Sequence, residues 1–125
     1  MNESILETIR TMIGGMALED EFDTDLIVCI NSSLMSLNQI GVGPDGEPFH
    51  ITGSSETWDQ LLEDRTDLEA VKMIVYIKTK IIFDPPVNSF IVDAMERQVK
   101  EYEWRICSKH DIDIYDEENP EESED

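Results

Sequence analysis

The sequence predicts an all-α protein, a small helical bundle of about five helices followed by an acidic flexible C-terminal tail. Apolar residues recur at intervals of three and four through most of the chain, which is the period of an amphipathic helix. Residues that cap helices stand before several of these stretches. After Ser108 acidic residues dominate and apolar residues become sparse. We expect helices at residues 3–14, 24–40, 54–63, 67–83 and 87–107.

The first helix is predicted by one apolar stripe and by signals at both of its ends. Ser4 and Glu7 have the spacing of a capping box, in which each side chain binds the other residue's backbone N–H. Gly14 and Gly15 predict the stop, because glycine adopts the left-handed conformation that ends many helices. The stripe consists of Ile5, Leu6, Ile9, Met12, Ile13 and Met16.

The second helix has the most regular apolar period, and Asp23 or Thr24 is placed to cap it. Its apolar face predicts core packing rather than a cofactor site. Small polar residues elsewhere on the cylinder would let another helix approach closely, in the same subunit or in the next. The apolar face consists of Leu26, Ile27, Ile30, Leu34 and Leu37, and the small polar residues are Asn31, Ser32, Ser33 and Asn38.

A long loop of residues 41–53 contains four glycines and two prolines. It lacks the Lys and Ser/Thr of a phosphate-binding loop and no strand precedes it, so nucleotide binding is not expected. His50 has no Ser or Cys nucleophile in an identifiable motif, which gives it no catalytic assignment. A loop of this length is either flexible or a partner contact, and the sequence leaves both open.

The next two helices are predicted with different clarity. Ser54 can cap a short helix that carries Trp58, and Thr66 with Glu69 forms a second capping box before residues 67–83. In residues 73–83 apolar and polar side chains alternate as they would in a strand. A helix is favoured nevertheless, because about 16 residues is long for a strand and no second strand is predicted to pair with it.

A stiff corner is expected where Asp84-Pro85-Pro86 ends the fourth helix, because proline fixes φ and has no N–H. Asn88 or Asp84 can cap the last helix, with Pro85 tolerated in its first turn. Phe83, Pro85, Pro86 and Phe90 are expected to set the angle between the two helices through fixed φ and aromatic packing.

The last helix is expected to bury one stripe, with Trp104 lying off it, either widening the core face or half exposed at an interface. The predicted stripe consists of Ile91, Val92, Met95, Val99, Tyr102 and Ile106. The chain is therefore expected to divide into a helical domain of residues 1–107 and an acidic, disordered tail of residues 108–125. Ile112, Ile114 and Tyr115 are the residues that would let the tail dock as a short arm.

Composition excludes several functions. With 29 acidic and 9 basic side chains, the chain has a formal charge of −20. Residues 109–125 hold nine acids and one Lys, a net of −8, which leaves −12 for residues 1–108. Such a surface repels nucleic-acid phosphates, so specific DNA binding is not expected. No secretory signal is evident, and the longest apolar stretch is too short to cross a bilayer, so the protein is expected to be cytoplasmic with no membrane contact.

No enzyme chemistry is predicted either. Cys29 and Cys107 are expected to be reduced thiols, and two Cys and two His scattered along the chain do not form a zinc site. No carboxylate pair, nucleophile or phosphate-binding loop stands out among the many acids. We therefore expect no catalytic residues, no cofactor and no metal.

Several segments together resemble the head–tail connector, or head-completion adaptor, proteins of long-tailed (siphovirus-type) bacteriophages. The resemblance covers about residues 5–106, and its most specific parts are Phe-Asp-Pro-Pro followed by Ser-Phe, and Glu-Trp-Arg. The resembling segments are residues 30–44, Trp58, residues 75–86, residues 88–90 and residues 101–105. The candidate architectural or interface residues are Phe83, Asp84, Pro85, Pro86, Phe90, Trp104 and Arg105.

The resemblance implies a structural virion protein that forms a ring of twelve copies beneath the capsid portal. Such a ring would extend the DNA channel and dock the next connector or a tail-completion protein, after assembly in the host cytoplasm. DNA would pass without specific binding, which agrees with the acidic composition. An alternative is a small acidic inhibitor that mimics DNA and binds a host protein through its carboxylates.

Overall fold

The computed structural model describes residues 3–63 and 67–118, with side chains up to Ser108. Within these ranges the chain is all-helical, as predicted, and the described residues form no strand, only an isolated bridge between Ser4 and Thr57. The α-helices are α1 (Ile5–Ile13), α2 (Asp23–Asn38), α3 (Trp58–Leu62), α4 (Leu68–Phe83) and α5 (Ser89–Glu118). Short 3-10 helices are η1 (Gly15–Leu18), η2 (Asp20–Phe22) and η3 (Pro44–Gly46).

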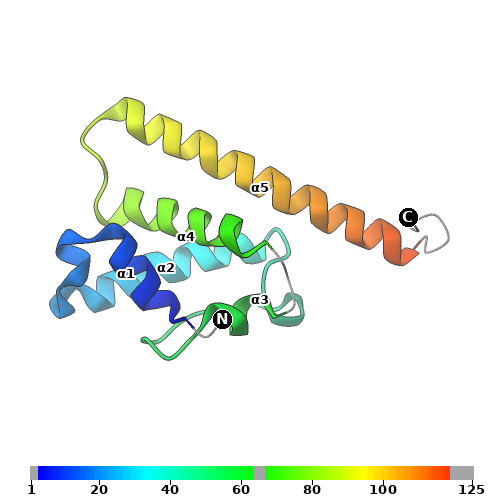
Figure 1. Ribbon diagram of the computed structural model, residues 1–125, viewed down its shortest axis with the longest axis horizontal. Helices are drawn as coiled ribbons and strands as arrows, with labels where there is room; N and C mark the ends of the chain where they lie inside the picture. The colour runs from blue at the N-terminus through cyan, green and yellow to red at the C-terminus, as the bar shows by residue number, and fades with distance from the viewer. Residues whose placement is uncertain (1–2, 64–66, 119–125) are drawn as a thin grey trace.

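Helix α4 lies at the centre of the bundle. It contacts α2 and α1 on one side and α5 on the other (Figure 1). The largest fully buried side chains come from α1, α2, α3 and α4, with Ile106 from α5 and Ile51 from the long loop. These helices bury one common core, and α5 covers α4 and contributes Val99 and Ile106 to the same core.

The strand-like alternation in α4 follows from this central position. Val71, Ile74, Val75 and Ile77 are all buried, because α1, α2 and α5 each cover part of the helix. A helix covered from several directions needs apolar residues around most of its circumference, so its sequence loses the simple 3.6-residue period. The choice of helix over strand is confirmed.

Capping residues agree with the prediction at α1 and differ at α2 and α3. Ser4 caps α1, and its side chain accepts a hydrogen bond from the Glu7 N–H at 3.2 Å, whereas the Glu7 carboxylate pairs with Arg10 and does not complete the predicted capping box. Helix α3 begins later than expected, and its capping box is formed by Thr57 and Gln60, so the role predicted for Ser54 was wrong. The capping role predicted for Thr66 lies outside the described residues.

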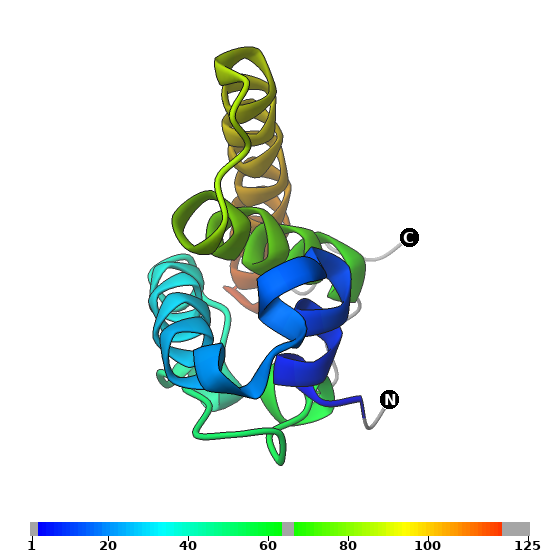
Figure 2. The same cartoon turned by 90° about the vertical axis from the view of Figure 1, so that its left-hand side faces the viewer.

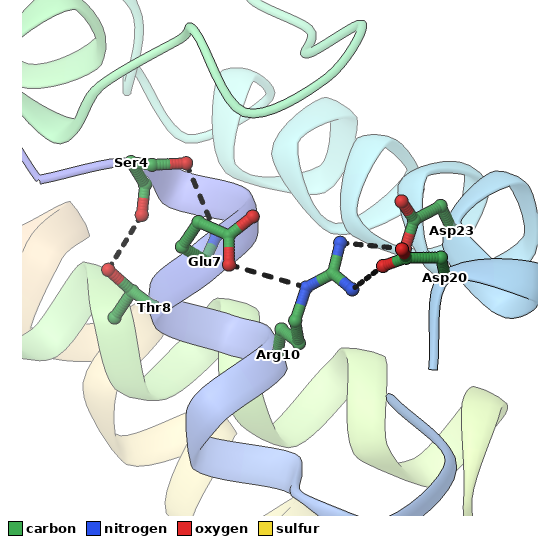
Figure 3. Close-up of polar contacts among 6 residues, drawn as sticks. All are labelled: Ser4, Glu7, Thr8, Arg10, Asp20 and Asp23. Carbon is green, nitrogen blue, oxygen red and sulfur yellow. Dashed lines mark hydrogen bonds and ion pairs between the residues drawn. The ribbon is translucent and has the colours of Figure 1, made fainter. Parts of the chain in front are cut away.

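The start of α2 is organised by a buried arginine instead of a capping side chain. Phe22 occupies the N-cap position, so the capping role predicted for Asp23 or Thr24 was wrong. The Arg10 guanidinium, almost fully buried, lies 2.6 Å from Asp23, 3.4 Å from Asp20 and 3.5 Å from Glu7 (Figure 3). These ion pairs tie α1 to η2 and to the first turn of α2.

The long loop of residues 41–53 is bound to α2 by two asparagine side chains. Asn31 accepts from the Ile51 N–H at 2.7 Å and donates to the Ile51 carbonyl at 3.0 Å. The Asn38 amide donates to the carbonyls of Val42 and Gly46. Gly43 is required here, since a Cβ at this position would lie 2.1 Å from the Glu47 carbonyl oxygen.

The turn at the end of this loop is stabilised by Glu56. Its carboxylate accepts hydrogen bonds from the Thr52 hydroxyl at 2.7 Å and from the Gly53 N–H at 3.3 Å. Desolvation by itself raises the pKa of Glu56, but these hydrogen bonds to the charged form outweigh it and hold the pKa below its usual value. The turn is therefore stabilised at neutral pH and loses that contribution as the pH falls through the lowered pKa.

Helix α5 is longer than predicted. It was expected to end at residue 107, but it continues to Glu118 and spans 30 residues, about 45 Å. Its last turns extend beyond the other helices (Figure 1). Residues 119–125 lie outside the described part, and the division between a domain and a tail stays a prediction.

A chain that ends at Ser108 should keep its helical core and its stability to within about 0.5 kcal/mol, because the removed turns extend past the bundle. Chemical denaturation followed by circular dichroism measures this. As the control, a chain that ends at Gln98 also loses the buried Val99 and Ile106 and should be strongly destabilised. If the chain that ends at Ser108 is unfolded, the predicted domain boundary is wrong.

Candidate interaction surface

The corner between α4 and α5 is built by two polar caps around the proline pair. The Lys80 ammonium donates to the Asp84 carbonyl at 3.1 Å and to its carboxylate at 3.3 Å, which closes the end of α4. The side chain of Asn88 accepts from the Phe90 N–H at 2.8 Å and begins α5. The predicted capping by Asn88 is confirmed, whereas Pro85 precedes the helix and is not in its first turn.

The two phenylalanines of the corner do not pack against each other. Phe83 contacts Phe22 edge to face, with ring centroids 6.3 Å apart, which joins the end of α4 to η2. Phe90 is 81% exposed. The expectation that Phe90 would set the corner by aromatic packing was wrong, because α5 begins at a distance from α4 and the two helices approach only further along (Figures 1 and 2).

This geometry creates an exposed apolar feature, residues 82–91, which we call the arch. Ile91 was predicted to be buried but is half exposed, because α5 begins at a distance from α4. Residues 85–92 include no charged side chain. The exposed apolar side chains of the arch are Ile82, Val87, Phe90 and Ile91. Four such residues together on a chain that is 30% charged form a candidate interaction surface.

An open groove lies below α5, between it and helices α2 and α4. Its volume is about 420 Å³. Small polar side chains line the groove on the α2 side, and mainly apolar side chains line it on the α4 side. The lining residues are Ser32, Ser33 and Ser36 of α2, Lys78, Ile81 and Ile82 of α4, and Glu96, Val99, Lys100 and Glu103 of α5.

The exposed face of α2 continues the groove. Val28 and Met35 are 63% and 66% exposed and lie seven residues apart, on the same side of the helix as Ser32 and Ser36. We call these four residues the α2 face. Residues 26–44 contain no charged side chain. Ser32 and Ser36 therefore border an uncharged surface. Their predicted role, to let another helix approach closely, requires such a surface.

Trp104 and Arg105 form a separate exposed site further along α5. Trp104 is 69% exposed, so it does not widen the core face. Arg105 forms an ion pair with Glu101 and lies over the Tyr102 ring at 5.7 Å. Trp104 comes 14 residues after Phe90 on the same helix, so the two positions are about 21 Å apart along its axis. The structure thus brings together the candidate residues from Phe83 to Phe90 and leaves Trp104 and Arg105 apart from them.

The described residues assemble no metal-binding cluster. No cluster of three or more His, Cys, Asp or Glu side chains with the geometry of a metal site occurs among them. The Cys29 thiol is buried, and both desolvation and the nearby Asp25 raise its pKa, which keeps it in the unreactive protonated form. Across the part of the chain that the structure covers, every helix is too short or too polar to cross a membrane.

Replacing Pro85 and Pro86 together with glycine should lower the free energy of unfolding by about 1–2 kcal/mol, because the unfolded chain gains conformational freedom. The altered corner should also weaken the assembly of copies into the ring that the resemblance implies. Urea denaturation measures the first effect, and Pro48→Gly in the long loop is a control that should cost about half as much and spare assembly. A double variant that unfolds and assembles like the parent would show that the corner has no architectural role.

Sequence reasoning missed the groove and the exposed Val87, Ile82, Val28 and Met35. A signal was present for three of these residues, since Val28 and Met35 lie in the uncharged residues 26–44 and Val87 lies in the uncharged residues 85–92 of a chain of net charge −20. Hydrophobic periodicity alone could not find them, because it assigns apolar residues to the core whether or not another element covers them.

Comparison with known proteins assigns the family. No curated protein and no solved structure matches the chain. The family model described as "phage connector protein" matches residues 5–113, which include the corner, the groove, Trp104 and Arg105. This match extends over most of the chain, so the protein belongs to the phage connector protein family, a family of structural components of the virion.

Proposed function

We propose that the protein is a head–tail connector without enzymatic activity. It assembles as a ring of twelve copies under the capsid portal, extends the DNA channel, and docks the next connector or a tail-completion protein. The observation that carries the proposal is the family match over residues 5–113. The exposed neutral arch and groove support it, because a protein that acts by assembly needs uncharged contact surfaces.

The charge of the chain fits a channel component. A wall that carries negative charge repels DNA phosphates, so DNA can pass without being held. Of the basic residues in the described part, Arg10, Lys72, Lys78, Lys80 and Arg105 are in ion pairs with acids. Little positive charge is therefore left to bind a phosphate backbone.

The free protein should associate weakly until a portal supplies the template. Twelve copies must lose translational and rotational freedom together, and each carries a charge of −20 that repels the others. Assembly would take place in the host cytoplasm, and the ring would remain in the virion.

Light scattering over a concentration series, with and without the portal protein, tests this function. Without the portal we expect monomers or weak association. With the portal we expect a complex of many copies. A stable dimer that ignores the portal and binds a nuclease or another DNA-binding protein would favour the DNA-mimicking inhibitor and overturn the proposal.

A further inference from the structure

Electrostatic repulsion opposes contact between two copies of this chain. Each copy has a formal charge of −20, and like charges facing each other across an interface oppose association. Copies can join only through surfaces from which charge is absent or balanced. Surfaces of this kind in the described part of the chain include the arch and the groove with its adjoining α2 face.

The groove is electrically balanced. Its lining includes Lys78 and Lys100 against Glu96 and Glu103, and Lys78 lies 3.3 Å from Glu103. The remaining lining residues are serines and aliphatic side chains. The α2 face beside it has no charge, and its exposed Val28 and Met35 offer apolar surface to a partner. This concave region therefore suits an apolar partner better than a charged one.

The arch is an apolar projection, and its shape and polarity complement those of the groove. Its Val87 is fully exposed, and Phe90 is also well exposed, so neither side chain is bound in the groove of its own chain. The corner is stiff, because Pro85 and Pro86 fix φ and Lys80 is bound to Asp84. A rigid apolar projection loses little conformational entropy when it binds.

The two surfaces meet at Ile82, but the tip of the arch and the α2 face belong to different elements of the fold. Figure 2 shows the start of α5 standing above the bundle, with α2 on its flank. Unlike surfaces on one chain produce a head-to-tail contact, which closes into a ring when the rotation per copy allows. The portal or the next connector would be a different chain with its own surface, whereas a second copy supplies both halves of the match.

We propose that the arch of one copy binds the groove and α2 face of the next copy, with Phe90 and Val87 contacting Met35 and the serines of α2. This inference rests on the proposed ring and names the surfaces that build it. The small side chains of Ser32 and Ser36 permit the close approach that such packing needs.

A disulfide pair tests the contact in the full chain. With Cys107→Ser as background, Val87→Cys and Ser36→Cys together should give a ladder of covalent multimers on the portal under mild oxidation. Either cysteine alone should give at least tenfold less product. As a control for random contact, Val87→Cys combined with Glu47→Cys, in the long loop, should give no ladder.

A mixing experiment tests the head-to-tail geometry. Phe90→Glu disables only the arch and Met35→Glu only the α2 face, so each variant alone should show at least a tenfold loss of portal-bound copies. The equimolar mixture should yield dimers that grow no further, because one good contact remains between the two variants. Both residues are exposed, so both variants should fold like the parent.

The outcomes separate this inference from the proposed function. A parent chain that binds the portal in many copies while the Val87 and Ser36 pair gives no ladder would overturn the contact and leave the connector function standing. Homodimers from Val87→Cys alone would show a symmetric contact, and cross-links from Val87 to the portal would assign the arch to that protein. Either result would overturn the inference. A parent that does not bind the portal would instead count against the connector function.

Discussion

Replacing Trp58 with alanine should lower the free energy of unfolding by about 3–5 kcal/mol, a loss large enough to unfold a marginally stable domain. Trp58 is fully buried, and its indole N–H donates to the Thr8 hydroxyl at 3.1 Å. Its backbone N–H donates to the Glu3 carbonyl, and Lys72 lies over its ring. The side chain therefore joins α1, α3 and α4, and its loss leaves a cavity where these helices meet.

Chemical denaturation of the parent and of two variants measures the effect. Trp58→Phe retains most of the apolar volume but leaves the Thr8 hydroxyl without the indole donor, so it should cost only about 1–2 kcal/mol. If alanine and phenylalanine cost the same, the hydrogen bond rather than the buried volume would account for the role of Trp58. If alanine costs less than about 1 kcal/mol, well below the usual range for a buried tryptophan, Trp58 does not join these helices.

Replacing Ile106 with alanine should cost about 2–4 kcal/mol and loosen α5 from α4. Ile106 is 1% exposed, and with Val99 it supplies the buried contacts of α5 among the described side chains, whereas the first turns of α5 stand away from α4. Hydrogen exchange measured by mass spectrometry should show faster exchange along α5, while α1 and α2 exchange as in the parent.

Trp104→Ala is the matched control on the same helix, two residues away. Because Trp104 is mostly exposed, its removal should change stability by no more than about 0.5 kcal/mol, although the side chain is larger than that of Ile106. Equal destabilisation by the two substitutions would contradict an orientation of α5 that buries Ile106 and exposes Trp104.

The helices could be predicted because their signals are local. The stripe of α1 and its Ser4 cap need only a few neighbouring residues to be recognised. The cap predicted for α2 was wrong because the start of this helix depends on a residue distant in the sequence. Arg10, which forms the ion pairs there, is ten or more residues away from its partners. The end of α5 was missed because low apolar content argues against a packed helix but not against one that extends past the bundle.

The candidate surface was predicted only in part. The residues from Phe83 to Phe90 were singled out correctly as one corner, but their packing was not, because exposure depends on how far α5 stands from α4. A stripe of Ile91, Met95 and Val99 looks the same in sequence whether or not its first member is covered. The groove brings together three helices distant in sequence, and no local pattern encodes it.

Electron cryomicroscopy of the protein bound to its portal tests the central claim most directly. The connector function predicts a closed ring of this chain, coaxial with the portal, that continues the central channel and leaves it open for DNA. Copies bound off the axis, a complex with too few copies to close a ring, or the absence of any portal complex would contradict it.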